Sequence, residues 1–208
     1  MLSDRNRNCL DDILLANSCS EGKVDGTLLE VRNKLKILGV IFTTNLKWNE
    51  NTEYICKKAY SKMWALRRMK ALGLDTFTLM DFYIKEVRVH LELAVPVCHS
   101  GFTISLSSDI ERVQRVAICI MLGSSEFHYI QTCSLLGLKP LFIRRQELCE
   151  RFALKTASPE SRHSDLFQLE KNGSHDTRSD SGKFREHVCT KVRFFKSHLP
   201  FLTRILNN

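Results

Sequence analysis

The period of the hydrophobic residues changes close to Trp48, and this change constrains the fold more than any other feature of the sequence. Before it, residues 27–31 and 35–43 are the strand candidates, and Asp25-Gly26 indicates a turn because this pair suits the positive φ angles of a tight hairpin. After it, apolar residues recur every three or four positions, as they do on one face of a helix. We therefore expect an α+β chain that is mostly α-helical, with an N-terminal β-hairpin followed by a helical bundle.

Several helices are predicted after the hairpin, and capping residues indicate their limits. Asn49 or Asn51 can cap the first helix, which ends near Leu72. Ser108 and Glu111 have the spacing of a capping box, which places the start of the third helix there. The predicted limits are 49 or 51 to 72, 75 to a point before 96, 108 to 123, a short helix that ends at 137, and a last long helix from 140.

The sequence is expected to divide into four segments. They are an irregular segment at 1–23, a hairpin at 24–48, a helical bundle at 49–156, and a flexible linker with a short C-terminal helix at 157–208. The linker is predicted because residues 157–186 are rich in Ser, His, Asp and Gly. Pro200 marks the expected start of the C-terminal helix.

The first predicted helix is strongly basic. Its apolar residues, such as Ile55, Ala59 and Met63, share one face, so most of its cations are expected on the solvent side or at the rim. The formal net charge of +8 favours an anionic partner, with nucleic acid as the first candidate, although a solvated surface or an acidic membrane would fit the same charge. Trp48 and Trp64 are expected to be core anchors, the alternative being stacking on bases. The basic residues of this helix are Lys57, Lys58, Lys62, Arg67, Arg68 and Lys70.

The sequence indicates no metal site and no cofactor. The eight cysteines stand at least ten residues apart, and the seven histidines lack metal-ligand spacing, so no zinc motif is present. No apolar run reaches the length of a membrane span, and the first residues do not form the apolar core of a signal peptide. We expect a soluble intracellular protein, cytoplasmic or nuclear, with reduced thiols and no membrane partner.

A series of short blocks runs in order through the chain. Those around the hairpin are 24–31, 35–40 and 46–49, and they include Leu38-Gly39-Val40 and Trp48. Further blocks lie at 57–59, 66–69, 82–83, 91–97, 109–117, 135–138, 144–148 and 190–207. Their order and separations resemble the C-terminal part of non-LTR retrotransposon reverse transcriptases.

The resemblance implies a thumb-like role. Residues 24–48 would correspond to the palm edge, with Leu38, Gly39 and Val40 in the segment likened to a primer grip, and residues 49–156 to the thumb. The implied partner is an RNA–DNA or DNA duplex, which the thumb holds weakly by its backbone without reading its sequence. Gly39 is also expected to mark a close backbone approach.

The catalytic part of that family is not indicated in this sequence. Reverse transcriptases hold two magnesium ions with aspartates from separate strands of the palm. The adjacent pair Asp11-Asp12 lies too close to Gly39 to match, and the polar residues 6–8 before it do not resemble a buried strand. This chain alone is therefore expected not to be an enzyme. The alternative is a non-enzymatic helical interaction protein, or a remnant without a nucleic-acid role.

Overall fold

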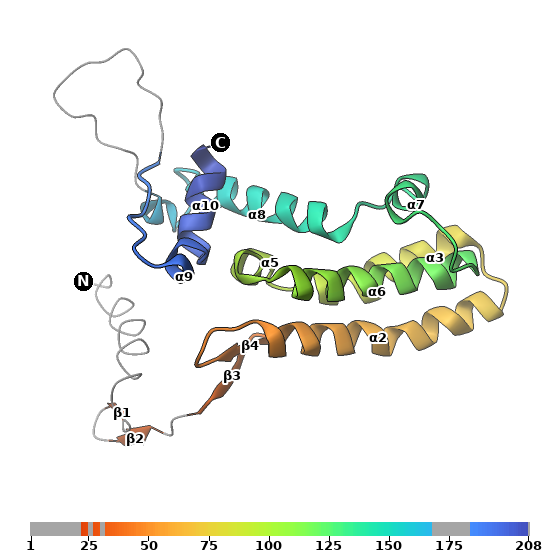
Figure 1. The fold of residues 1–208 in the computed structure, drawn as a ribbon, viewed down its shortest axis with the longest axis horizontal. Coiled ribbons are helices and arrows are strands. Elements are labelled where there is room, and N and C mark those ends of the chain that lie inside the picture. Colours follow the sequence, from red (N-terminus) through yellow and green to blue (C-terminus); the bar gives the residue numbers. More distant parts are fainter. Residues whose placement is uncertain (1–21, 25–26, 30–31, 168–183, 208) are drawn as a thin grey trace, which may run out of the picture.

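The computed structural model describes residues 22–24, 27–29, 32–167 and 184–207 (Figure 1). The expected α+β fold is confirmed, because a short antiparallel N-terminal part precedes a series of helices. The elements in chain order are β1 (Gly22–Val24), β2 (Thr27–Leu29), β3 (Lys34–Ile37), β4 (Val40–Thr43), α2 (Asn49–Ala71), α3 (Thr76–Phe82), the π-helix η1 (Tyr83–Arg88), α4 (Val89–Leu91), α5 (Val95–Cys98), the 3₁₀ helix η2 (His99–Gly101), α6 (Ile104–Leu122), α7 (Tyr129–Leu135), α8 (Leu141–Ala157), the 3₁₀ helix η3 (Ser164–Leu166), α9 (Val192–Phe195) and α10 (His198–Asn207).

The strands form two separate hairpins. In the first, β1 pairs with β2 and Val24 lies opposite Thr27, as the predicted Asp25-Gly26 turn requires, although residues 25 and 26 lie outside the described residues. The second hairpin corrects the expectation of one strand at 35–43. Here β3 pairs antiparallel with β4, and the chain reverses at Leu38 and Gly39, whose φ angles are 47° and 87°. Two successive positive φ angles make a two-residue turn whose twist matches that of paired strands.

Gly39 has a close neighbour as well as its turn conformation, and this neighbour is a side chain. A Cβ atom at this position would lie 3.2 Å from Cδ2 of Leu93, which follows α4. The glycine therefore allows the hairpin to turn and to approach the helices at the same point. Its role as the turn was not evident from the sequence, because 35–43 is apolar enough to continue as a single strand.

The long helix α2 has the predicted limits and buries the predicted face. Ile55, Ala59, Met63 and Leu66 are buried along one side, where α2 packs against α6. The N-terminal cap differs from expectation, because Trp48 occupies that position and makes no side-chain capping bond. Asn51 is instead buried, and its Oδ1 accepts a hydrogen bond from the Ile41 amide of β4 at 3.0 Å. This contact ties the second hairpin to the first turn of α2.

The capping box expected at Ser108 is wrong. Helix α6 begins at Ile104, and the Thr103 side chain caps it by accepting a bond from the Leu106 amide at 3.3 Å. Ser108 therefore lies inside the helix. Glu111 turns toward another helix, since its carboxylate accepts bonds from the Leu141 and Phe142 amides at the start of α8. Helix α6 starts one turn earlier than predicted, because the apolar residues from Ile110 onward indicated a later start.

Two apolar clusters hold the described helices together. The larger lies between α2, the segment from α3 to α4, α6 and α7, and it includes Tyr83, Val87 and Leu91 at four-residue intervals. In Figure 1 α6 lies between α2 and α8, in agreement with the contacts of α6 to both. The smaller cluster joins α5, α8 and α10 around Val95 and Leu202. The predicted C-terminal helix is thus present from His198, and it packs on α8.

Candidate nucleic-acid interface

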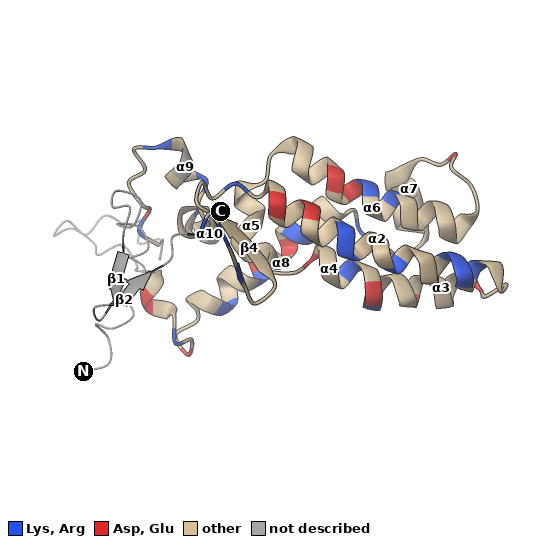
Figure 2. Cartoon of the chain, turned by 90° about the horizontal axis from the view of Figure 1, so that it is seen from below, with Lys and Arg blue, Asp and Glu red and all other residues tan. Residues whose placement is uncertain are grey.

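The basic residues of α2 occupy two kinds of position. Lys57, Lys58, Arg67 and Arg68 are exposed, whereas Lys62 and Lys70 are partly buried at the edges of the packed face. In Figure 1 α2 forms the lower edge of the bundle, and Figure 2 views the molecule from that side, where Lys and Arg recur along the helices. The helix therefore presents four of its six cations to solvent.

Lys62 and Lys70 have partners within the bundle. The Lys70 ammonium donates to the Met121 carbonyl at 2.8 Å, at the end of α6, where carbonyls have no partner within the helix. The Lys62 ammonium pairs with Glu86 of η1 at 3.0 Å. A phosphate would have to displace both contacts, so these two residues are better explained as links between helices than as part of a binding surface.

A further cation comes from the second hairpin, and sequence reasoning missed it. Lys36 of β3 and Lys58 of α2 both lie over the ring of Tyr54, 4.5 and 5.0 Å from its centroid. Hydrogen bonding to these two ammonium groups lowers the pKa of the Tyr54 phenol. Lys36 could not be assigned to this region beforehand, because its place depends on the hairpin packing against the first turns of α2.

The exposed cations of α2 differ in whether they already pair with an acidic side chain. Lys57 pairs with Glu53 at 2.6 Å, but both side chains are largely exposed, so the pair contributes little and can exchange for another anion. The same pairing lowers the pKa of Glu53. Within the described part of the chain, Arg67 and Arg68 have no acidic partner. They are the cations of α2 most readily available to a ligand.

The two tryptophans lie in opposite environments. Trp48 is half-buried, with its ring edge-on to Phe42, and a Cβ atom on Gly101 would collide with its indole. The expectation of a core anchor is correct for Trp48 and wrong for Trp64, which is 69% exposed. Position 64 lies on the side of α2 opposite the buried stripe, so its indole has no helix to pack against.

The primer-grip-like residues lie at the tip of the second hairpin. Leu38 is 95% exposed, Gly39 makes the turn, and Val40 is buried at 6% exposure. The hairpin contacts α2 through the bond from Ile41 to Asn51. These residues therefore lie beside the N-terminal half of the basic helix, on a support that is fixed to it.

Arg144 and Arg145, which belong to one of the sequence blocks, are not available as a binding pair. Arg144 donates to both carboxylate oxygens of Glu92, one of them at 3.1 Å. Arg145 is completely buried, and it donates to the Ser107 hydroxyl at 2.7 Å. Their position early in α8 places one at the edge of the bundle and the other inside it.

The described residues contain no cluster of three His, Cys, Asp or Glu side chains that could hold a metal ion. Asp11 and Asp12 lie outside the described residues. Among the described helices, none combines the length and the apolar character needed to cross a membrane.

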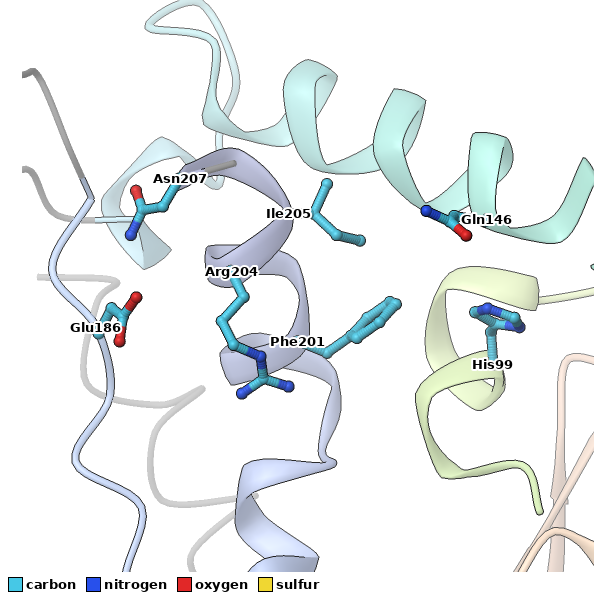
Figure 3. A pocket seen from close by; sticks show the side chains of 7 residues that line it. All are labelled: His99, Gln146, Glu186, Phe201, Arg204, Ile205 and Asn207. Carbon is cyan, nitrogen blue, oxygen red and sulfur yellow. The ribbon is translucent and has the colours of Figure 1, made fainter. Parts of the chain in front are cut away.

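A hollow of about 530 Å³ lies away from the basic helix, between η2, α8 and α10 (Figure 3). Two of its polar residues hold the C-terminal segment in place. Asn207 exchanges two hydrogen bonds of 2.9 Å with the Phe184 backbone, and Arg204 donates to the Phe195 carbonyl at 2.9 Å. The hollow is therefore best described as a gap between packed elements.

No protein-family model matches this chain, and neither a curated protein nor a solved structure shows significant similarity to it.

Proposed function

We propose that this chain is the thumb-like portion of a non-LTR retrotransposon reverse transcriptase, and that it holds a primer–template duplex by its backbone. The ordered sequence blocks support this proposal, and so does the arrangement of a hairpin followed directly by a long basic helix. In this proposal the chain contributes no group to phosphoryl transfer. A separate palm would supply the metal-binding aspartates.

The exposed cations along α2 carry the proposal. Lys57, Lys58, Arg67 and Arg68 lie on the solvent side of one rigid helix, and Lys36 lies beside them on β3. Phosphate contacts dominate non-specific nucleic-acid binding and need positive charge without a fixed base contact. A helix that is held from behind by α6 supplies that charge on a stable surface.

Titration of a labelled RNA–DNA duplex at several salt concentrations tests the proposal. The parent protein should bind weakly, without sequence preference, and with an affinity that falls steeply as salt rises. Replacing Lys57, Lys58, Arg67 and Arg68 together with glutamine should lower the slope of log affinity against log salt by up to about three or four, because each lost phosphate contact removes about 0.9.

A matched control removes the same charge elsewhere. Arg151, Lys155, Lys191 and Lys196 are exposed, and within the described residues their side chains have no acidic partner. Replacing these four with glutamine should reduce the slope much less than the α2 variant does. Equal effects of the two variants would mean that only net charge matters, and an unchanged α2 variant would leave the basic face as a solvated surface.

A second candidate function is protein binding by the hairpin. Leu35 and Ile37 of β3 are 53% and 47% exposed, and Leu38 in the turn is 95% exposed, so the second hairpin presents apolar side chains along an edge strand. Such an edge can pair with a strand of another chain. Binding of this kind would depend little on salt, and it would persist in the glutamine variant of α2.

A further inference from the structure

The solvent side of α2 combines aromatic and basic side chains. Trp64 is 69% exposed and Tyr60 is 38% exposed, and they lie four residues apart on the helix. This spacing is one helical turn, or about 6 Å along the axis, and it places both rings on the same side. Exposure alone does not set Trp64 apart, since Phe77 of α3 is 75% exposed. What distinguishes Trp64 is that basic side chains share its helix, whereas α3 contains no Lys or Arg.

Cations flank the two rings at both ends. Lys57 lies one turn before Tyr60, and Arg67 and Arg68 lie one turn after Trp64. From Lys57 to Arg68 the helix advances by about 16 Å. The order along the helix is thus cation, ring, ring, cation.

This order fits an unpaired strand better than it fits a closed duplex. In a duplex the base faces are covered by their neighbours, so a protruding indole reaches only groove edges and sugars. An unpaired base exposes its π-face, and proteins that bind single strands combine a basic track with rings on which bases stack. A purely apolar protein partner would leave Arg67 and Arg68 without counter-charges, since these two have no acidic partner in the described part of the chain.

We propose that Trp64, assisted by Tyr60, stacks on unpaired bases, so that α2 binds single-stranded nucleic acid in preference to a blunt duplex. The proposal deepens the proposed function, on which it rests for the role of the α2 cations. It adds that the cations, which contact duplex phosphates in the proposed function, also contact the phosphates of a single-stranded extension of the primer–template. Trp64 is then the residue that selects this extension.

The test compares labelled oligothymidylate with a blunt duplex of the same length at one low salt concentration. The parent protein should bind oligothymidylate more tightly. Trp64→Leu should weaken that binding about five- to a hundredfold, the loss expected when one stacked base is released, and should change duplex binding less than twofold. Trp64→Phe should retain much of the affinity because it keeps a ring.

Phe77→Leu is the matched control, because Phe77 is an equally exposed ring, at 75%, on the neighbouring helix α3. It should leave both affinities unchanged. A spectroscopic readout follows the ring itself. The sequence contains two tryptophans, so a Trp48→Phe background reports Trp64 alone, and its fluorescence should be quenched by oligothymidylate.

The outcomes separate this inference from the proposed function. If Trp64→Leu binds oligothymidylate as the parent does, while the fourfold glutamine variant loses both ligands, α2 contacts phosphates only and the stacking inference is wrong. Equal affinity of the parent for the two ligands also overturns it. If the parent binds neither ligand at low salt, both the inference and the proposed function fail.

Discussion

Replacing Glu111 with alanine should destabilise the protein more than an ordinary surface substitution does. The Glu111 carboxylate accepts bonds from the Leu141 and Phe142 amides, which are the first of α8, and from the hydroxyl of Tyr129. Pro140, at the cap position of α8, supplies no side-chain bond. A residue of α6 therefore takes the place of a local cap and holds α7 to α8.

The expected size of the effect follows from these contacts. Loss of a helix cap costs about 1 kcal/mol, and removal of a charge from a helix N-terminus costs about 0.3–1 kcal/mol. Tyr129 is mostly buried, and leaving its hydroxyl without an acceptor costs about 1–3 kcal/mol. We expect a loss of about 2–5 kcal/mol in unfolding free energy, or about 5–20 °C in Tm for a chain of this size.

Urea unfolding followed by far-UV circular dichroism measures this loss. Glu111→Gln keeps an acceptor oxygen but loses the charge, so it should cost about half as much. Glu126, which is exposed in the loop between α6 and α7, serves as the control, and Glu126→Ala should stay within about 0.5 kcal/mol of the parent. If Glu111→Ala also stays within that range, the carboxylate does not cap α8 and the reasoning is refuted.

Three other predictions concern buried groups. Arg145 is completely buried and donates one hydrogen bond, but its Nε and Nη1 have no partner among the described residues. Arg145→Met should therefore leave the unfolding free energy unchanged or raise it by up to about 4 kcal/mol, and a loss above about 1 kcal/mol would contradict this. Burial and the nearby Arg145 charge lower the pKa of His99 from 6.5 to about 4. As the pH falls, this histidine is therefore protonated in the unfolded chain before it is protonated in the folded one, and the unfolding free energy should decrease by up to about 3 kcal/mol between about pH 6.5 and pH 4. Urea midpoints across this range should therefore vary less in His99→Gln than in the parent, and equal curves would exclude the effect. Burial raises the pKa of Cys98 and Cys149 to about 12, so a short iodoacetamide pulse on the folded protein at neutral pH should leave both unlabelled by mass spectrometry, whereas labelling at the rate seen in urea would show that they are accessible.

Local patterns in the sequence were sufficient for the type and the approximate limits of most helices. The apolar stripe of α2 and the Asp75 cap of α3 depend on residues that are three or four positions apart, and such residues contact each other whenever a helix forms. The Ser108 capping box has the same local spacing, yet it failed because Thr103 starts α6 one turn earlier. A local motif thus predicts a helix more securely than it predicts where the helix begins.

The candidate site was predicted in part. The sequence identified the helix and the cations that face solvent, because both follow from the position of the apolar stripe. It could not separate Lys62 and Lys70 from the others, since their partners Glu86 and Met121 lie 24 and 51 residues away. Nor could it bring in Lys36, whose place beside Tyr54 depends on how the hairpin packs.

The sequence by itself determined that a hairpin precedes amphipathic helices and that the first helix carries a basic face, because hydrophobic period and charge are properties of neighbouring residues. Only the tertiary structure decided which of two tryptophans is covered. The Trp48 ring packs against Phe42 and lies directly over Gly101, whereas Trp64 lies on the side of α2 that no described element covers. The same is true of Glu111, which has the spacing of a local cap but bonds to the start of α8, 30 residues away. Burial and long-range hydrogen bonds depend on which surfaces meet, and that is settled when the helices pack together.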